Sequence, residues 1–166
     1  MKYIKIQDTV VVFDELTNHG FMARLLSEYG EVQTAGFVKL FPTADNTIRH
    51  SVSGRSSTLK IDSNPVVDKE IVQEYFKMSS DNPVNFISYE DTLILFPINC
   101  AFDIVAAMKA IWPGADFVHG LVSFTTVETD DFRFESGYRA IPAFSNLVGT
   151  VTDATKFTFD CNIRAD

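Results

Sequence analysis

The pattern of apolar and polar positions occurs twice along this chain of 166 residues. Residues 3–54 align with residues 86–137 at an offset of 83 positions, which widens to 84 in the middle. Each copy begins with an alternating segment, a short polar turn and a fully apolar segment, a pattern typical of a β-hairpin. Identical residues recur at Ile4/Ile87, Asp8/Asp91, Thr9/Thr92, Phe13/Phe96, Ala23/Ala106, Gly36/Gly120, Val38/Val122, Arg49/Arg133, Ser53/Ser136 and Gly54/Gly137.

A helical repeat follows each hairpin. In the first copy, apolar residues recur at three- and four-residue intervals between Asp14, the expected N-cap, and Gly30. In the second copy, Pro97 and Asn99 are expected to open the helix and Pro113-Gly114 to end it. Core positions of the two helices correspond one to one: Phe21/Ile104, Met22/Val105, Leu25/Met108 and Tyr29/Trp112.

Two more strands complete each predicted copy, at residues 32–41 and 47–53 and at residues 117–127 and 131–136. A glycine interrupts the first strand of each pair and predicts a bulge or a close backbone approach at that point. The fold class is therefore α+β: a tandem duplication of a ββαββ unit, with antiparallel sheets and helices packed on one face. Such a duplication predicts pseudo-twofold symmetry, and the axis creates a natural binding cleft.

The chain divides into four segments that we expect to form one compact domain. A connector helix is predicted at residues 65–78, with Val67, Ile71, Tyr75 and Phe76 on one face. A closing strand is predicted at residues 156–163, after a loop-like stretch at 144–153. The segments are 1–62 for the first unit, 63–83 for the connector helix and linker, 84–143 for the second unit, and 144–166 for the loop and closing strand.

The composition is that of a folded protein, with 46% apolar residues and a mean hydropathy of +0.05. Phenylalanine occurs 15 times. Most of these rings are expected in the core, because each buries a large area. A surplus beyond one small core also suits an oligomer or partner surface, so we expect either a protein partner or self-association as a homo-oligomer.

The formal net charge is −8, from 22 acidic and 14 basic side chains. This balance disfavours ordinary nucleic-acid binding and anionic membrane surfaces, which both need basic residues. It favours solubility, and a DNA-mimicking inhibitor is the sharper alternative. No apolar run is long enough for a transmembrane helix, and the N-terminal sequence does not resemble a signal peptide. The only two cysteines, Cys100 and Cys161, lie far apart in the sequence and do not form the pattern of a disulfide-rich protein. We expect a cytoplasmic protein.

No GxSxG, Walker-type or GxGxxG motif occurs, and we expect neither catalysis nor a cofactor. His19, His50 and His119 lack zinc-ligand spacing, so no metal site is predicted. His50 and His119 are interpreted as structural rings, and Cys100 as a buried, inert thiol, although the sequence leaves their roles open.

One set of residues suits a small anion. The turn that begins at Gly54 resembles a phosphate-cradling turn, because small residues leave backbone N–H groups free beside a cation. Its counterpart begins at Gly137, and a matched pair of strand arginines near the axis suits bidentate binding of carboxylate or phosphate. The structural alternative is that these arginines pair with acids on the sheet face. The candidate ligand-binding residues are Arg49, Arg133, Gly54, Arg55, Ser56, Gly137 and Arg139.

Three short stretches within the first 80 residues carry a resemblance: residues 35–38, residues 54–59, and residues 63–65 with Asp68 and Ile71. Together they resemble short uncharacterised bacterial and phage reading frames. The resemblance implies no activity, and suggests a phage or mobile-element protein that acts by binding.

Three functional hypotheses follow. The first is a non-catalytic acidic binding protein (a regulator, inhibitor or structural subunit) that acts through protein–protein contacts. The alternative is a small-molecule or nucleotide/phosphate-binding protein, with or without catalysis, whose site lies at the repeat interface. A clamp- or saddle-like scaffold on DNA is a third hypothesis, which the negative charge disfavours.

Overall fold

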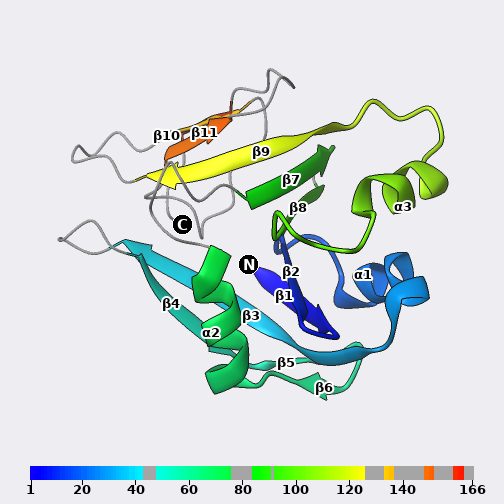
Figure 1. Ribbon diagram of the computed structural model, residues 1–166, viewed down its shortest axis with the longest axis vertical. Coiled ribbons are helices and arrows are strands. Elements are labelled where there is room, and N and C mark those ends of the chain that lie inside the picture. Colours follow the sequence, from blue (N-terminus) through cyan, green and yellow to red (C-terminus); the bar gives the residue numbers. More distant parts are fainter. Residues whose placement is uncertain are drawn as a thin grey trace.

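The α+β prediction is confirmed by a computed structural model, in which a mostly antiparallel sheet is combined with helices (Figure 1). The structure describes residues 1–42, 48–75, 84–90, 92–125, 133–136, 148–151 and 159–162. The main sheet has eight strands in the order β11-β9-β7-β8-β2-β1-β3-β4. Its strands are β1 (Lys2–Ile6), β2 (Thr9–Phe13), β3 (Val32–Pro42), β4 (Ile48–Ser53), β7 (Val84–Tyr89), β8 (Thr92–Phe96), β9 (Val118–Thr125) and β11 (Val148–Val151).

Both predicted hairpins form, β1–β2 and β7–β8, and each closes with a two-residue loop. The first loop residue is Gln7 in one hairpin and Glu90 in the other, with φ of 55° and 50°. A positive φ is uncommon for a residue other than glycine. The same backbone conformation therefore recurs at the same point of both hairpins.

The fourth strand predicted for the second copy, residues 131–136, does not join the main sheet. The part of it that the structure describes, β10 (Arg133–Ser136), pairs instead with β12 (Phe159–Asn162) in a separate two-stranded sheet. The strand itself is therefore confirmed in part, but its expected place beside β9 is taken by β11. β11 comes from a stretch that was predicted to be a loop, and that prediction is wrong. Tertiary pairing decides the position of such four-residue strands, because strand propensity depends strongly on context. The predicted closing strand is confirmed as β12.

Helices form where they were predicted, but the N-caps of the first and third differ. The helices are α1 (His19–Leu25), followed by a 3-10 turn at Ser27–Tyr29, α2 (Pro65–Tyr75) and α3 (Ile104–Ile111). Asn18 caps α1 through a bond of 2.6 Å from Gly20 N, and Asp103 caps α3 through a bond of 2.9 Å from Ala106 N. Asp14 does not cap α1, because its carboxylate is bound at the joint of two strands. No helix in the described ranges is long and apolar enough to cross a membrane.

The helices cover both faces of the sheet (Figure 1). α1 and α3 lie side by side on one face, where they bury a core that continues across β1, β2, β7 and β8. α2 lies on the opposite face, where it contacts β4 and β2, and its Val72 is fully buried. The main core contains Ile4, Ile6, Val11, Phe13, Met22, Leu25, Leu26, Ala35, Ile87, Ile94, Phe96, Phe102, Ile104 and Met108.

The predicted apolar face of α2 is wrong in part. Asp68 and Val72 are fully buried against the sheet, whereas Val67 is 42% exposed and Ile71 is half-buried. The polar Asp68 occupies a position that the hydrophobic pattern assigned to the surface. Phe76 lies outside the described residues.

Candidate functional site

The turn that was predicted to bind an anion is part of a tight hairpin between β5 (Arg55–Ser56) and β6 (Ile61–Asp62). Gly54 enters it with a φ of 82°, and Ser63 N donates to Gly54 O over 3.0 Å. Ser56 is fully buried, and its hydroxyl oxygen accepts a backbone N–H of the same turn at 3.1 Å. Arg55 Nε lies 3.5 Å from Asp62 Oδ1, and both side chains are exposed. Arg55 and Ser56 thus have partners within the hairpin, although the exposed Arg55–Asp62 pair is a weak one.

The two matched arginines lie in different sheets. Arg49 is on β4, opposite Phe41, and Arg133 is on β10, opposite Asn162. Gly137 and Arg139 lie outside the described residues. Convergence of the two arginine side chains on one ligand stays a prediction.

The three histidines and Cys100 are buried or half-buried. His19 is buried, its Nε2 lies 3.0 Å from Gly36 O, and burial lowers the pKa of the ring. A neutral ring with its proton on Nε2 satisfies this carbonyl. His50 is buried in β4, and His119 is half-buried on β9, opposite Ile87. Burial also raises the pKa of the half-buried Cys100 thiol, which disfavours the reactive thiolate. Within the described residues, no group of three or more His, Cys, Asp or Glu side chains is placed to hold a metal ion.

A buried carboxylate joins β2 to β8, and sequence reasoning missed it. Asp14 is 3% exposed and accepts four hydrogen bonds. Oδ1 accepts from Leu16 N at 2.9 Å and from Thr17 N at 2.8 Å, and Oδ2 accepts from Thr17 Oγ1 and Leu93 N, each at 2.8 Å. Asp14 N donates to Leu93 O at 3.1 Å. The carboxylate therefore extends the β2–β8 pairing and fixes the loop that carries Leu16.

A second buried carboxylate fixes α2 on the sheet. Tyr3 and Asp68 are both fully buried, and the Tyr3 hydroxyl donates to Asp68 Oδ2 at 2.5 Å. Asn64 N donates to the same oxygen at 2.9 Å, so Asp68 also caps the start of α2. Burial and then the Asp68 carboxylate raise the pKa of Tyr3. This bond explains why Asp68 faces the sheet and why Val66 and Val67 face outward.

The Tyr3 ring lies across Gly36, the first of the two strand glycines. A Cβ at Gly36 would lie 3.3 Å from Tyr3 Cε1 and only 2.6 Å from the backbone oxygen of Ser53. The close approach predicted at Gly36 is therefore confirmed. Glycine is required there because no side chain fits between the strand and its neighbours.

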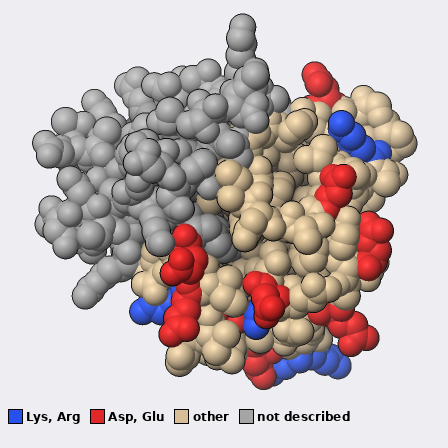
Figure 2. Space-filling view, viewed as in Figure 1, with Lys and Arg blue, Asp and Glu red and all other residues tan. Residues whose placement is uncertain are grey.

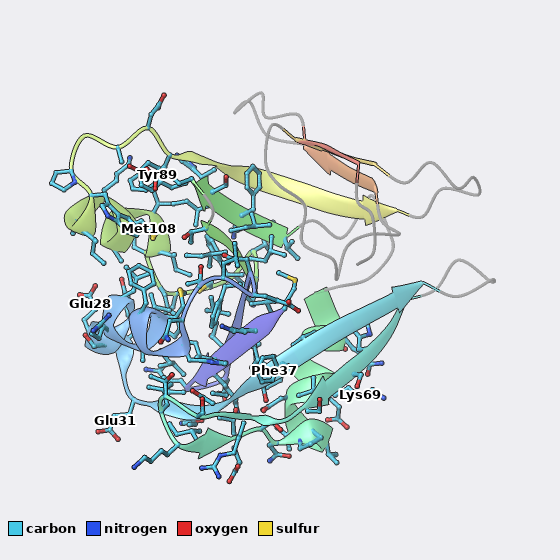
Figure 3. All side chains as sticks on the ribbon, turned by 180° about the vertical axis from the view of Figure 1, so that it is seen from behind. Glu28, Glu31, Phe37, Lys69, Tyr89 and Met108 are labelled. Atoms are coloured by element: carbon cyan, nitrogen blue, oxygen red, sulfur yellow. The ribbon has the colours of Figure 1, made fainter. Side chains whose placement is uncertain are left out.

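Four aromatic rings meet at one end of the sheet, and we call them the aromatic cluster: Phe21 of α1, Tyr89 at the end of β7, Trp112 after α3, and Phe117 before β9. Ring centroids are 5.5 Å apart for Phe21–Trp112, 5.4 Å for Tyr89–Trp112 and 4.9 Å for Tyr89–Phe117. All four rings are half-buried. Figure 3 shows Tyr89 at the end of the sheet beside α3, which carries Met108. The surplus of aromatic residues was the one feature of the sequence that could have pointed to this cluster. The spacing of the four residues along the chain did not predict that their rings meet.

No protein-family model matches the chain, and comparisons with curated proteins and with solved structures found no match.

Proposed function

We propose that this protein is a non-catalytic acidic binding protein that acts through protein–protein contacts, as a regulator, inhibitor or structural subunit. One observation carries the proposal: large apolar side chains are exposed on backbone that is firmly held. Leu16 is 74% exposed and Val66 is 71% exposed. The loop of Leu16 is fixed by Asp14, and the first turn of α2 is fixed by the Tyr3–Asp68 bond. Apolar side chains on an ordered backbone lose little conformational entropy when a partner covers them.

The charge supports a partner of opposite sign. The chain carries a formal charge of −8, and acidic side chains are scattered over the face in Figure 2. Complementary charge across an interface accelerates association and excludes wrong partners. A basic protein surface is the natural complement, and we place the interaction in the cytoplasm.

We propose further that the fold arose by tandem duplication of a ββαββ unit and has pseudo-twofold symmetry. The strand order supports this, because the order β4-β3-β1-β2 in one half of the sheet, read inward from its edge, corresponds to the order β11-β9-β7-β8 in the other half. The left-handed first residue of both hairpin loops supports it as well. In this view β11 took the place of the fourth strand in the second unit. A phage or mobile-element origin rests on the resemblance alone.

Affinity capture from native cells tests the proposed function. The full chain is compared with Leu16→Ser and Val66→Ser, which remove exposed apolar groups without touching the core, and with Ser57→Ala as an exposed polar control. We expect a stoichiometric protein partner that the control retains and that at least one of the two serine variants loses. Recovery of a small anionic ligand without any stoichiometric protein would contradict the proposal and favour the alternative site around Arg55.

A further inference from the structure

The outer side of α3 is apolar, although it is exposed. Of the eight residues of this helix, only Lys109 is polar. Met108 is buried in the main core, whereas Ala106 and Ala110 lie one turn apart on the other side of the helix and are both exposed. Ile111, the last residue of α3, is 44% exposed. A helix that is apolar on all sides is normally covered on all sides, so α3 has the composition of a helix with a second contact.

Charges of opposite sign flank this surface at its two ends. Asp103, the N-cap of α3, and Lys109, in its last turn, are both exposed, and Ala106 lies midway between them. Positions three residues apart are neighbours on one side of a helix. The cap bond uses Asp103 Oδ1, and the second oxygen of a carboxylate can accept from another group. Along its outer side, α3 therefore presents an acid, apolar residues and a base, in that order.

α1, which lies beside α3, runs antiparallel to it (Figure 1). At one end of the pair, Phe21 and Trp112 are in contact, with a ring-centroid distance of 5.5 Å. At the other end, Tyr29 stacks on Phe102 with a ring-centroid distance of 4.7 Å. The chain that follows α1 therefore lies at the end where α3 begins.

The charges on α1 and its 3-10 turn extend this polarity. Glu28 is exposed next to Tyr29, at the end where α3 begins, and Figure 3 shows it on the outer side of the two helices. Arg24 is exposed about one turn nearer the end where α3 terminates. Two acids and two bases thus balance on this surface, whereas the whole chain carries a net charge of −8. Two further exposed acids belong to segments that lead into β3 and β9: Glu31 and Asp116.

A surface with this order of charges is complementary to itself. When two copies of α3 pack antiparallel about a twofold axis at Ala106, Asp103 of each copy lies opposite Lys109 of the partner subunit. The opposed helix dipoles and the small side chain at the axis favour this arrangement, whereas a uniformly charged protein would meet a like charge at one end. We infer that a second copy of this chain covers the outer side of α3 and forms a twofold homodimer. The inference goes beyond the proposed function, which concerns a partner of different sequence.

Sedimentation equilibrium of the full chain measures the association. Helices of seven and eight residues bury a small area, so we expect a dissociation constant of about 10–500 µM. Between about 5 µM and 1 mM chain, the average mass should rise from that of one chain to that of two and then stay constant. A monomer at every concentration would overturn the inference. So would growth beyond two chains, because a twofold contact closes on itself.

Matched charge variants locate the contact. Lys109→Glu and Lys69→Glu make the chain more acidic by the same amount, and both positions are exposed on helices. Lys69 lies on α2, which covers the opposite face of the sheet. Lys109→Glu places like charges opposite each other and should weaken the dimer about tenfold or more, whereas Lys69→Glu should change its dissociation constant less than about twofold. Equal losses in both variants would show general repulsion between acidic chains and would overturn the assignment.

Two variants of α3 that keep the helix intact complete the test. Ala106→Gln puts a long polar side chain on the axis, and glutamine has a helix propensity close to that of alanine. Asp103→Asn removes the charge but keeps a side chain that caps helices well. With unchanged circular dichroism, Ala106→Gln should weaken the dimer about tenfold or more and Asp103→Asn about threefold to tenfold. A dimer that forms as tightly with Ala106→Gln as with the wild type would place the contact elsewhere and overturn the inference.

Discussion

Replacement of Asp14 by alanine should destabilise the protein by about 3–5 kcal/mol. The Asp14 carboxylate accepts three backbone N–H groups and one hydroxyl, and the N–H groups of Thr17 and Leu93 are buried. After truncation these two donors have no acceptor, and each buried unsatisfied donor costs roughly 1–3 kcal/mol. The rest of the expected loss in the free energy of unfolding comes from the hydrogen bonds that the charged Asp14 carboxylate no longer accepts. The change is a large part of the roughly 5–15 kcal/mol that stabilises a typical domain.

Urea unfolding followed by both Trp112 fluorescence and far-ultraviolet circular dichroism measures this effect. With a slope of about 2 kcal/mol per molar urea, the midpoint should fall by roughly 2 M while the slope stays constant. Trp112 lies in the second half of the chain and Asp14 in the first. Coincident transitions by the two probes would show that the two halves unfold together.

Two variants serve as controls for Asp14→Ala. Thr17→Val removes only the hydroxyl donor and should cost about 1 kcal/mol. Asp62→Ala removes an exposed carboxylate and should cost less than about 0.5 kcal/mol. If Asp14→Ala lowered the free energy of unfolding by under about 1 kcal/mol, or by no more than Asp62→Ala, the role assigned to this carboxylate would be refuted.

Two further substitutions probe the face beneath α2. Tyr3→Phe removes the donor to the buried Asp68 and should lower the free energy of unfolding by about 2–3 kcal/mol, as measured by urea unfolding at neutral pH. The pKa of Tyr3 is raised above the ordinary value of 10.0, so the unfolded chain loses this proton first and the stabilisation fades above pH 10. The difference between wild type and Tyr3→Phe should therefore narrow at alkaline pH, and a constant difference would contradict the assignment. Gly36→Ala places a Cβ 2.6 Å from the Ser53 backbone oxygen and should lower the free energy of unfolding by about 2–3 kcal/mol in the same assay. Gly114→Ala meets no atom within 4 Å and should cost only about 1 kcal/mol for its φ of +84°, so equal effects would refute the steric argument.

Local periodicity was enough to predict much of the fold. The two hairpins, the three helices and the closing strand all lie where the apolar spacing placed them. The close approach at Gly36 was predictable as well, because a glycine inside a strand often marks a place where another part of the backbone comes near. These features depend on neighbours in sequence or on one adjacent strand.

Long-range partners account for what was missed. Residues 148–151 lack a strong strand pattern and become a strand because the edge of β9 is open to them. Asp68 faces the sheet because Tyr3, at a separation of 65 residues, donates to it. A charged residue in a helical pattern is normally assigned to solvent. The pattern therefore predicted that the wrong face of α2 packs against the sheet.

The candidate site was less predictable than the fold. The sequence favoured arginines because they matched between the two copies. Arg49 and Arg133 lie in different sheets and Arg55 pairs with Asp62, and the binding of one ligand by these arginines stays a prediction. The aromatic cluster could not be predicted from the sequence, because its members come from four segments with no common spacing. Clusters of this type are assembled by topology, and a surplus of aromatic residues was the only sign of this one in the sequence.

Native mass spectrometry of the full chain, purified gently from its native cells, tests the proposed function most directly. We expect a complex whose added mass is that of a protein chain, dissociating as salt is raised because the acidic surface contributes to binding. A chain that carries a bound small anion and no protein partner, at any salt concentration, would contradict the proposal and assign the protein to small-molecule binding.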